Sequence, residues 1–239
     1  VLHQDDILYP GFLELFFSVQ KQYPDVRHIF TTCDYIDSND DIIHKFKYYD
    51  KNIVLYKNNE YLKAYQKEYG PFPHIHRCPG VITHRSIFEE GCRYASAAGH
   101  IADDDFFYRV GQFTNVVGIM KPMAAFRIHN ASESSSIGKH TLVKRLAEDY
   151  IYQIFQWKNS LFLDKQDTYY FEYNAIKFVA RNIVLALRSK NLESIRDALK
   201  LFKKTEKYNF QSRLYWFRFE LTTLKAISIL ITFGIKKDN

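Results

Sequence analysis

The chain of 239 residues has no long hydrophobic run, and it is poor in cysteine, glycine and proline. No stretch reaches the roughly 18 apolar residues that a membrane-spanning helix needs. With 9 glycines and 6 prolines, collagen-like, repeat and low-complexity architectures are excluded. Cys33, Cys78 and Cys92 cannot all be paired within one chain and show no CxxC spacing. A reducing, cytoplasmic setting is therefore expected.

Apolar and aromatic residues, by contrast, are plentiful. They make up 46% and 17% of the chain, which is enough for a folded core and too much for a disordered protein. The length allows one large domain or a domain with an appendage. The net charge of +6 favours anionic partners such as nucleotide diphosphates or an acidic membrane surface. Nucleic acid is a third anionic class, but we do not expect it as the partner.

A first acidic cluster stands near the start, in the run Leu-His-Gln-Asp-Asp-Ile-Leu-Tyr-Pro of residues 2–10. The pattern predicts a buried strand that ends in an acidic loop, followed by a helix that begins at Pro10-Gly11. Acids at the carboxyl end of a strand in an open α/β sheet lie where such sheets bind ligands. Asp5 and Asp6 offer the oxygen ligands that suit Mg²⁺ or Mn²⁺ with phosphates. Taken alone, the pair is also typical of a solvated turn.

The predicted strand–loop–helix junction lies at the very start of the given chain. No βαβ unit precedes residue 3, and residue 1 is valine rather than methionine. We therefore expect the chain to be part of a longer protein whose upstream portion completes the sheet.

A second acidic cluster, Asp103-Asp104-Asp105, is predicted to open a helix over residues 106–110. Acids in the first turn are favoured by the positive end of the helix dipole, and that alone would explain them. A chemical interpretation is that Asp104 and Asp105 crowd Asp103 and raise its pKa, as a general base requires.

The remaining pattern predicts alternating strands and helices, then helices only. A helix should follow Gly11 and end near Tyr23-Pro24. Ser86 is the predicted N-cap of another helix, with Glu89 three residues on and Gly91 at its end. Strands are predicted at residues 26–35, 42–43 (as a hairpin), 53–56, 78–83, 116–120 and 123–128. We place a boundary near residue 138, between an α/β portion (1–138) and a helical C-terminal region (139–239).

Two further segments invite a functional interpretation. A zinc site of His74, His76, Cys78 and His84 is disfavoured, because this spacing matches no standard ligand pattern. The C-terminal stretch of residues 213–235 mixes aromatic with basic side chains. It either packs against the catalytic portion or a second subunit, or it docks peripherally on the inner face of a membrane.

The α/β portion resembles the GT-A glycosyltransferases of the large inverting family 2. A D-x-D-D-x-x-x-P motif of that family is matched by residues 3–10. A glycine-containing strand before an R-x-x-[FL]-E-x-x-G segment is matched by Gly80 and residues 85–91.

Two later motifs continue the resemblance in the right order. An acidic E-D-x-D helix start is matched by residues 102–109. A Y-R-x-H segment with a serine-rich loop after it is matched by residues 126–136. The resemblance covers roughly residues 1–136.

For the metal, the resemblance implies that Asp5 holds a divalent cation, Mn²⁺ or Mg²⁺, on the diphosphate of a nucleotide-sugar donor. His3 replaces the motif's first Asp, and an imidazole can still bind the metal there. His129 matches a position that approaches the metal or the diphosphate.

For catalysis, the resemblance implies that Asp103 is the base that deprotonates the acceptor hydroxyl. Ala102 replaces the usual Glu before it, so Asp104 remains an alternative base. Asp6, Arg109, Arg127 and Ser134 would border the donor.

The resemblance implies the C-terminal half of a GT-A, Rossmann-like domain with a helical tail. The activity would be transfer of a hexose, most often from a UDP-sugar, to a glycan or lipid-linked acceptor with inversion, as in bacterial surface polysaccharide synthesis. Since the nucleotide-binding half lies upstream in the family, the chain as given should bind donor poorly. Two alternatives stay open: a metal-dependent phosphohydrolase or nuclease, and a degenerate, non-catalytic sugar-nucleotide binding module.

Overall fold

The structure is a computed structural model, and it describes residues 3–46, 52–57, 60–66, 68–69, 72–73, 75–129, 137–157 and 165–205. The chain divides into two compact units. The first comprises residues 1–96 and 102–136, and the second comprises residues 97–101 and 137–239. Strands and helices occur together in the first unit, which confirms the predicted α/β class.

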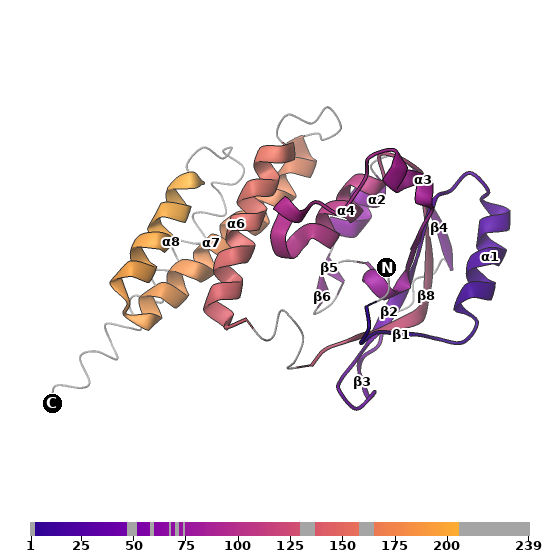
Figure 1. The fold of residues 1–239 in the computed structure, drawn as a ribbon, viewed down its shortest axis with the longest axis horizontal. Coiled ribbons are helices and arrows are strands. Elements are labelled where there is room, and N and C mark those ends of the chain that lie inside the picture. The colour runs from indigo at the N-terminus through magenta and orange to yellow at the C-terminus, as the bar shows by residue number, and fades with distance from the viewer. Residues whose placement is uncertain are drawn as a thin grey trace. The chain divides into compact units, whose positions relative to one another are not determined.

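Two long parallel strands form the centre of a six-stranded mixed sheet in the first unit (Figure 1). They are β2 (His28–Ile36) and β8 (Val116–Arg127). Each has two short antiparallel neighbours on its outer edge, one beside its first half and one beside its second half. These are β4 (Ile53–Tyr56) and β1 (Ile7–Leu8) on β8, and β7 (Val81–Thr83) and β3 (Ile42–His44) on β2.

Helices cover both faces of this sheet (Figure 1). On one face, α1 (Phe12–Gln22) packs Val19 against Ile29 and the β8 residues Val117 and Ile119. On the other face, His28 and Phe30 contact aromatic rings of α2 (Glu60–Gln66) and α4 (Ala102–Val110). Every residue of β2 is buried, as expected of a strand covered on both sides. Each large apolar side chain buried here contributes about 1.5–3 kcal/mol.

Several sequence predictions are confirmed. Strand β2, its hairpin partner β3 and strand β4 all lie where the pattern placed them. Helix α1 begins after Gly11 and ends at Gln22. Gly11 has a φ of 79°, a left-handed conformation that glycine adopts without strain.

Two local predictions are wrong. The strands expected at 116–120 and 123–128 are one strand, β8, whose register against β2 shifts around Pro122. A proline is tolerated there because irregular pairing does not need its missing N–H. The N-cap of α3 (Arg85–Glu89) is His84 rather than Ser86, since Nδ1 of His84 accepts the backbone N–H of Ser86.

The strand predicted over residues 78–83 is only partly present, because β7 begins at Val81. Residues 78–80 form a 3₁₀ turn, η1 (Cys78–Gly80), that packs against β1, β2 and β8. A Cβ on Gly80 would lie 2.6 Å from the carbonyl oxygen of Thr31, so only glycine fits here. A small separate hairpin joins β5 (Glu68–Tyr69) and β6 (Phe72–Pro73).

In the ranges that the structure describes, the second unit is helical. It contains α6 (Lys139–Trp157), α7 (Lys165–Ser189) and α8 (Leu192–Lys204), together with most of the 3₁₀ segment η2 (Ser96–Ile101). Tyr150 of α6 stacks on Phe178 of α7 at 5.5 Å between ring centroids. Asn191 caps α8 by accepting two backbone N–H groups. The predicted segment at 213–235 lies outside the described residues.

No helix in the described ranges combines the length and the apolar character that crossing a membrane requires.

Candidate active site

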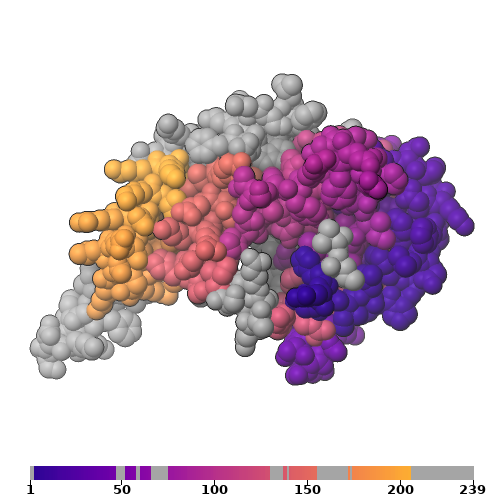
Figure 2. All heavy atoms as spheres, viewed as in Figure 1, coloured from indigo at the N-terminus to yellow at the C-terminus, as the bar shows by residue number. Residues whose placement is uncertain are grey.

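The acidic loop of residues 3–6 lies at the carboxyl end of β8, the end at which parallel sheets bind ligands. Arg127, the last residue of β8, fixes it there. The backbone N–H of Arg127 donates to Oδ1 of Asp6 at 3.0 Å, and its Nε donates to the carbonyl of Asp5 at 2.8 Å. The loop itself is at the surface of the first unit, where the N-terminal segment can be seen in Figure 2.

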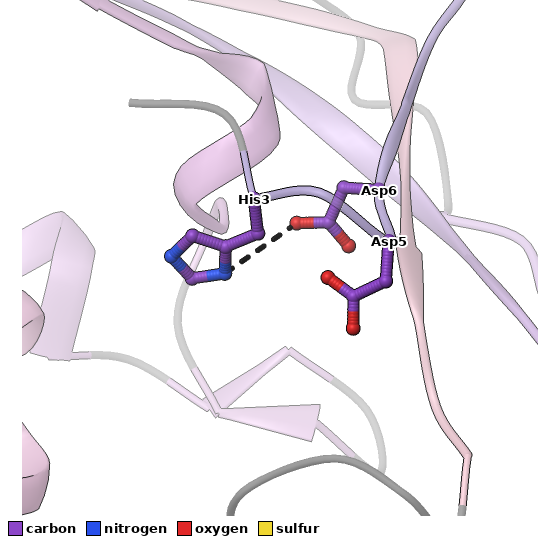
Figure 3. Close-up of side chains that lie close together, drawn as sticks. All are labelled: His3, Asp5 and Asp6. Carbon is purple, nitrogen blue, oxygen red and sulfur yellow. Dashed lines mark ion pairs between the residues drawn. The ribbon is translucent and has the colours of Figure 1, made fainter.

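Three side chains of this loop converge on one point. His3, Asp5 and Asp6 each offer a ligand atom, and these atoms lie within 4.8 Å of one another (Figure 3). The Asp6 side chain is 1% exposed, and His3 Nδ1 lies 3.7 Å from its Oδ2. That Oδ2 is buried without a hydrogen-bond partner in the described part of the chain. Burial raises the pKa of Asp6, although the N–H of Arg127 opposes the rise.

This arrangement fits a divalent cation. A buried carboxylate oxygen without a donor is costly, and a bound cation would compensate it. Two carboxylates with one imidazole suit Mn²⁺ better than a softer metal, and Mg²⁺ would accept the oxygens.

His129 lies beside the group without joining it. Its Nε2 is 2.9 Å from Oδ2 of Asp5, and this hydrogen bond lowers the pKa of Asp5. The geometry places Asp6, predicted on the donor, among the candidate metal ligands. His129, predicted as a ligand, holds Asp5 in the orientation that a ligand needs.

The second acidic cluster occupies the first turn of α4, as predicted. Burial, and next the charge of Asp104, raise the pKa of Asp103 to about 6. The thiol of Cys78 donates to Oδ2 of Asp103 at 3.6 Å, and the backbone N–H of Asp104 donates to its Oδ1. The side chain of Asp104 instead accepts the hydroxyl of Tyr65 at 2.8 Å. A pKa of about 6 suits Asp103 to the role of the candidate base.

The two arginines predicted on the donor have protein partners in the structure. Arg109 donates to Asp105 and to the carbonyl of Arg93. The guanidinium of Arg127 reaches the Asp5 carbonyl and residues 37–40. Both arginines thereby order the backbone around the site, and their donor contacts stay predictions. Ser134 lies outside the described residues.

Arg77 is the site residue that the sequence did not indicate. It precedes η1, donates from Nε to the Tyr35 hydroxyl at 3.1 Å, and lies over the ring of Phe126. Its charge acts on Asp103 and on the buried thiol of Cys33, which also senses Asp6. Arg77 therefore connects the two acidic clusters. Nothing in the proline-rich segment around it distinguishes it from an ordinary surface arginine.

The residues of the disfavoured zinc set have other partners. Nε2 of His76 is 2.6 Å from the Tyr61 hydroxyl inside the aromatic core, Cys78 bonds to Asp103, and His84 caps α3. His74 lies outside the described residues. All three cysteines are buried free thiols.

No protein-family model matches this chain, and no curated protein matches it.

Proposed function

We propose that this protein is a metal-dependent inverting glycosyltransferase whose first unit is part of a GT-A domain. The observation that carries the proposal is the group of His3, Asp5 and Asp6 at the carboxyl end of the parallel pair β2 and β8. The resemblance of the four motifs and the raised pKa of Asp103 support it. The donor would be a nucleotide-diphosphate sugar, with a UDP-sugar as the first choice, and the acceptor a glycan or a lipid-linked sugar of a bacterial surface polysaccharide.

Each residue then has a defined task. His3, Asp5 and Asp6 would hold Mn²⁺ or Mg²⁺, and His129 would orient Asp5. A divalent cation bound here would neutralise charge on the diphosphate as a Lewis acid. Asp103 accepts the proton of the acceptor hydroxyl while the acceptor oxygen attacks the anomeric carbon from the face opposite the diphosphate. A pKa of about 6 suits this task, because the carboxylate is ionised at neutral pH yet still basic enough to take the proton.

The test is sugar transfer by the complete protein with UDP-sugars, Mn²⁺ and a panel of acceptor glycans, with mass spectrometry to identify the product. Asp5→Ala should abolish transfer through loss of the metal. Asp103→Asn should lower kcat about 10²–10⁴-fold with little change in donor KM. Asp25→Asn, an exposed change in the same unit, is the matched control.

The remaining outcomes discriminate between functions. Full turnover in both Asp5→Ala and Asp103→Asn would refute the proposal. Release of nucleotide products that needs no acceptor would indicate a phosphohydrolase. Absence of heat on titration of UDP with Mn²⁺ would indicate a non-catalytic module.

A further inference from the structure

Arg77 is held rigidly against the carboxyl halves of both central strands. Its Nε donates to Tyr35 of β2, and its guanidinium carbon lies 5.6 Å from the centre of the Phe126 ring of β8. Tyr35 and Phe126 are neighbours across the parallel strands β2 and β8. Arg77 therefore contacts both central strands at the same level of the sheet. An arginine fixed in this way loses little further entropy when it binds a ligand.

The outer edge of this guanidinium is unused by the protein. In the part of the chain that the structure describes, neither Nη atom of Arg77 has a hydrogen bond or an ion pair, while Nε is occupied. Two parallel N–H groups on such an edge match two oxygens of a phosphate or carboxylate. Burial is the largest influence and lowers the pKa of Arg77, but the carboxylate of Asp104 raises it, and a guanidinium stays charged in proteins.

The position of Arg77 is between the candidate metal group and the candidate base. On one side, η1, which directly follows Arg77, packs against β1, the strand that follows the candidate metal group. On the other side, Arg77 acts on Asp103, whose carboxylate accepts the thiol of the next residue, Cys78. In a transfer reaction this is where the leaving phosphate would lie.

We propose that Arg77 is a catalytic residue that binds the phosphate leaving the sugar through its two Nη atoms. This inference rests on the proposed function. The anomeric carbon–oxygen bond to the phosphate breaks, and its electron pair stays on the phosphate oxygen. The acceptor oxygen forms the new bond to the anomeric carbon, and its proton goes to Asp103. Arg77 donates N–H bonds to the phosphate as its negative charge grows, which stabilises the transition state more than the ground state.

The direct test is binding of inorganic pyrophosphate, with and without Mg²⁺, by calorimetry on the full chain. Pyrophosphate carries the phosphate chemistry without a nucleoside, so it does not depend on a base or ribose pocket. Arg77→Gln should weaken binding at least tenfold. Arg77→Lys keeps the charge but loses the two parallel N–H groups. Its affinity for pyrophosphate should lie between those of the wild type and Arg77→Gln. Tyr35→Phe removes the Nε partner and should weaken binding a few-fold. Arg85→Gln, an exposed arginine paired only with Glu89, is the matched control and should bind as the wild type does.

Each contrary result is informative. Equal binding by wild type and Arg77→Gln, or no binding of pyrophosphate by the wild type, would overturn the assignment. If Arg77→Gln lost binding of methyl glucuronide but kept that of pyrophosphate, Arg77 would serve an acidic acceptor instead, and the assignment to the leaving phosphate would also be overturned. An unchanged melting temperature of Arg77→Lys would show that its weaker binding does not result from unfolding.

Activity separates this inference from the proposed function. If the protein transfers sugar and Arg77→Gln keeps the wild-type kcat, the role of Arg77 is wrong and the function stands. If pyrophosphate binding needs Arg77 but no sugar donor is turned over, the anion site stands and the function is wrong. If both are right, Arg77→Gln should lower kcat about 10²–10³-fold.

Discussion

At the scale of single residues, the site depends on carboxylates whose environments differ. Asp5 lies near the surface, and a hydrogen bond from His129 lowers its pKa. Asp6 is buried beside it, and burial raises its pKa. Asp103 has a pKa of about 6 at the start of α4. Acids with different pKa values can serve different functions, one binding a metal while another accepts a proton. Solvated acids with equal pKa values cannot do this.

The raised pKa of Asp103 predicts a stability cost at neutral pH. Because the folded-state pKa of about 6 exceeds the ordinary value of 3.8, protonation favours the folded state. This stabilisation is complete below about pH 4 and is lost as the pH rises through 6. Asp103→Asn should therefore raise the free energy of unfolding at pH 7.5 by about 1–3 kcal/mol, and by less at pH 4.5.

Urea denaturation at the two pH values measures this effect. Asp25→Asn, an exposed substitution, should change the free energy by less than about 0.5 kcal/mol at both. A loss of stability in Asp103→Asn at pH 7.5 would show that the ionised carboxylate stabilises the fold, contrary to the prediction. A gain in stability together with a loss of transfer would mark Asp103 as a residue kept for chemistry.

At the scale of elements, the sequence pattern located the long strands and helices better than the short ones. Strand β2 and the helices α1 and α4 carry strong periodicity or clear boundary residues, and each was predicted. Strand β1 is two residues long and pairs with β8 more than a hundred residues away, so no local signal exists for it. The continuity of β8 through Pro122 is likewise a property of its partner β2.

The site residues likewise divide into those with a local sequence signal and those defined by tertiary contacts. Asp103 opens α4, as the pattern predicted. Asp5 and Asp6 were predicted to follow a buried strand, but in the described residues the adjacent strand, β1, comes after them. The positions of Asp6 in the candidate metal group and of His129 beside Asp5 depend on tertiary contacts, since the end of β8 brings His129 to Asp5. Arg77 was missed because its meaning comes from Tyr35 and Phe126, which lie far from it in the sequence.

The turn η1 gives a test at this scale. Gly80→Ala would force a Cβ to within 2.6 Å of the Thr31 carbonyl in β2, and the backbone would have to move. We expect a loss of about 2 kcal/mol or more in the free energy of unfolding. Gly138→Ala meets nothing within 4 Å and, as a change at the residue before α6, should cost no more than about 1 kcal/mol. Urea denaturation of the two variants measures the difference, and equal stabilities would contradict the tight packing of η1.

At the scale of the whole molecule, the chain contains two units with separate cores. The candidate metal group, the candidate base and Arg77 all belong to the first unit, and the helices α6, α7 and α8 belong to the second. A ligand of the site should therefore stabilise the first unit specifically. A defect in a helix of the second unit should leave the first unit unchanged.

Calorimetry with two opposite perturbations tests this independence. Mn²⁺ at a hundred times its dissociation constant should stabilise the first unit by about 2.7 kcal/mol, and Asp5→Ala should remove the effect. Asn191→Ala deletes the cap of α8 and should destabilise the second unit by about 1 kcal/mol. A single transition moved by both changes would mean that the units unfold together.

The hydrogen bond between Arg127 and Asp6 also determines when, during synthesis of the chain, the acidic loop can take its folded position. The two residues are 121 positions apart, and β1, which follows the acidic loop, has no strand to pair with until β8 has been made. At about 5–20 residues per second, a ribosome needs roughly 6–24 s to add that stretch. The nascent chain thus acquires its candidate metal group only after nearly all of the first unit has been synthesised.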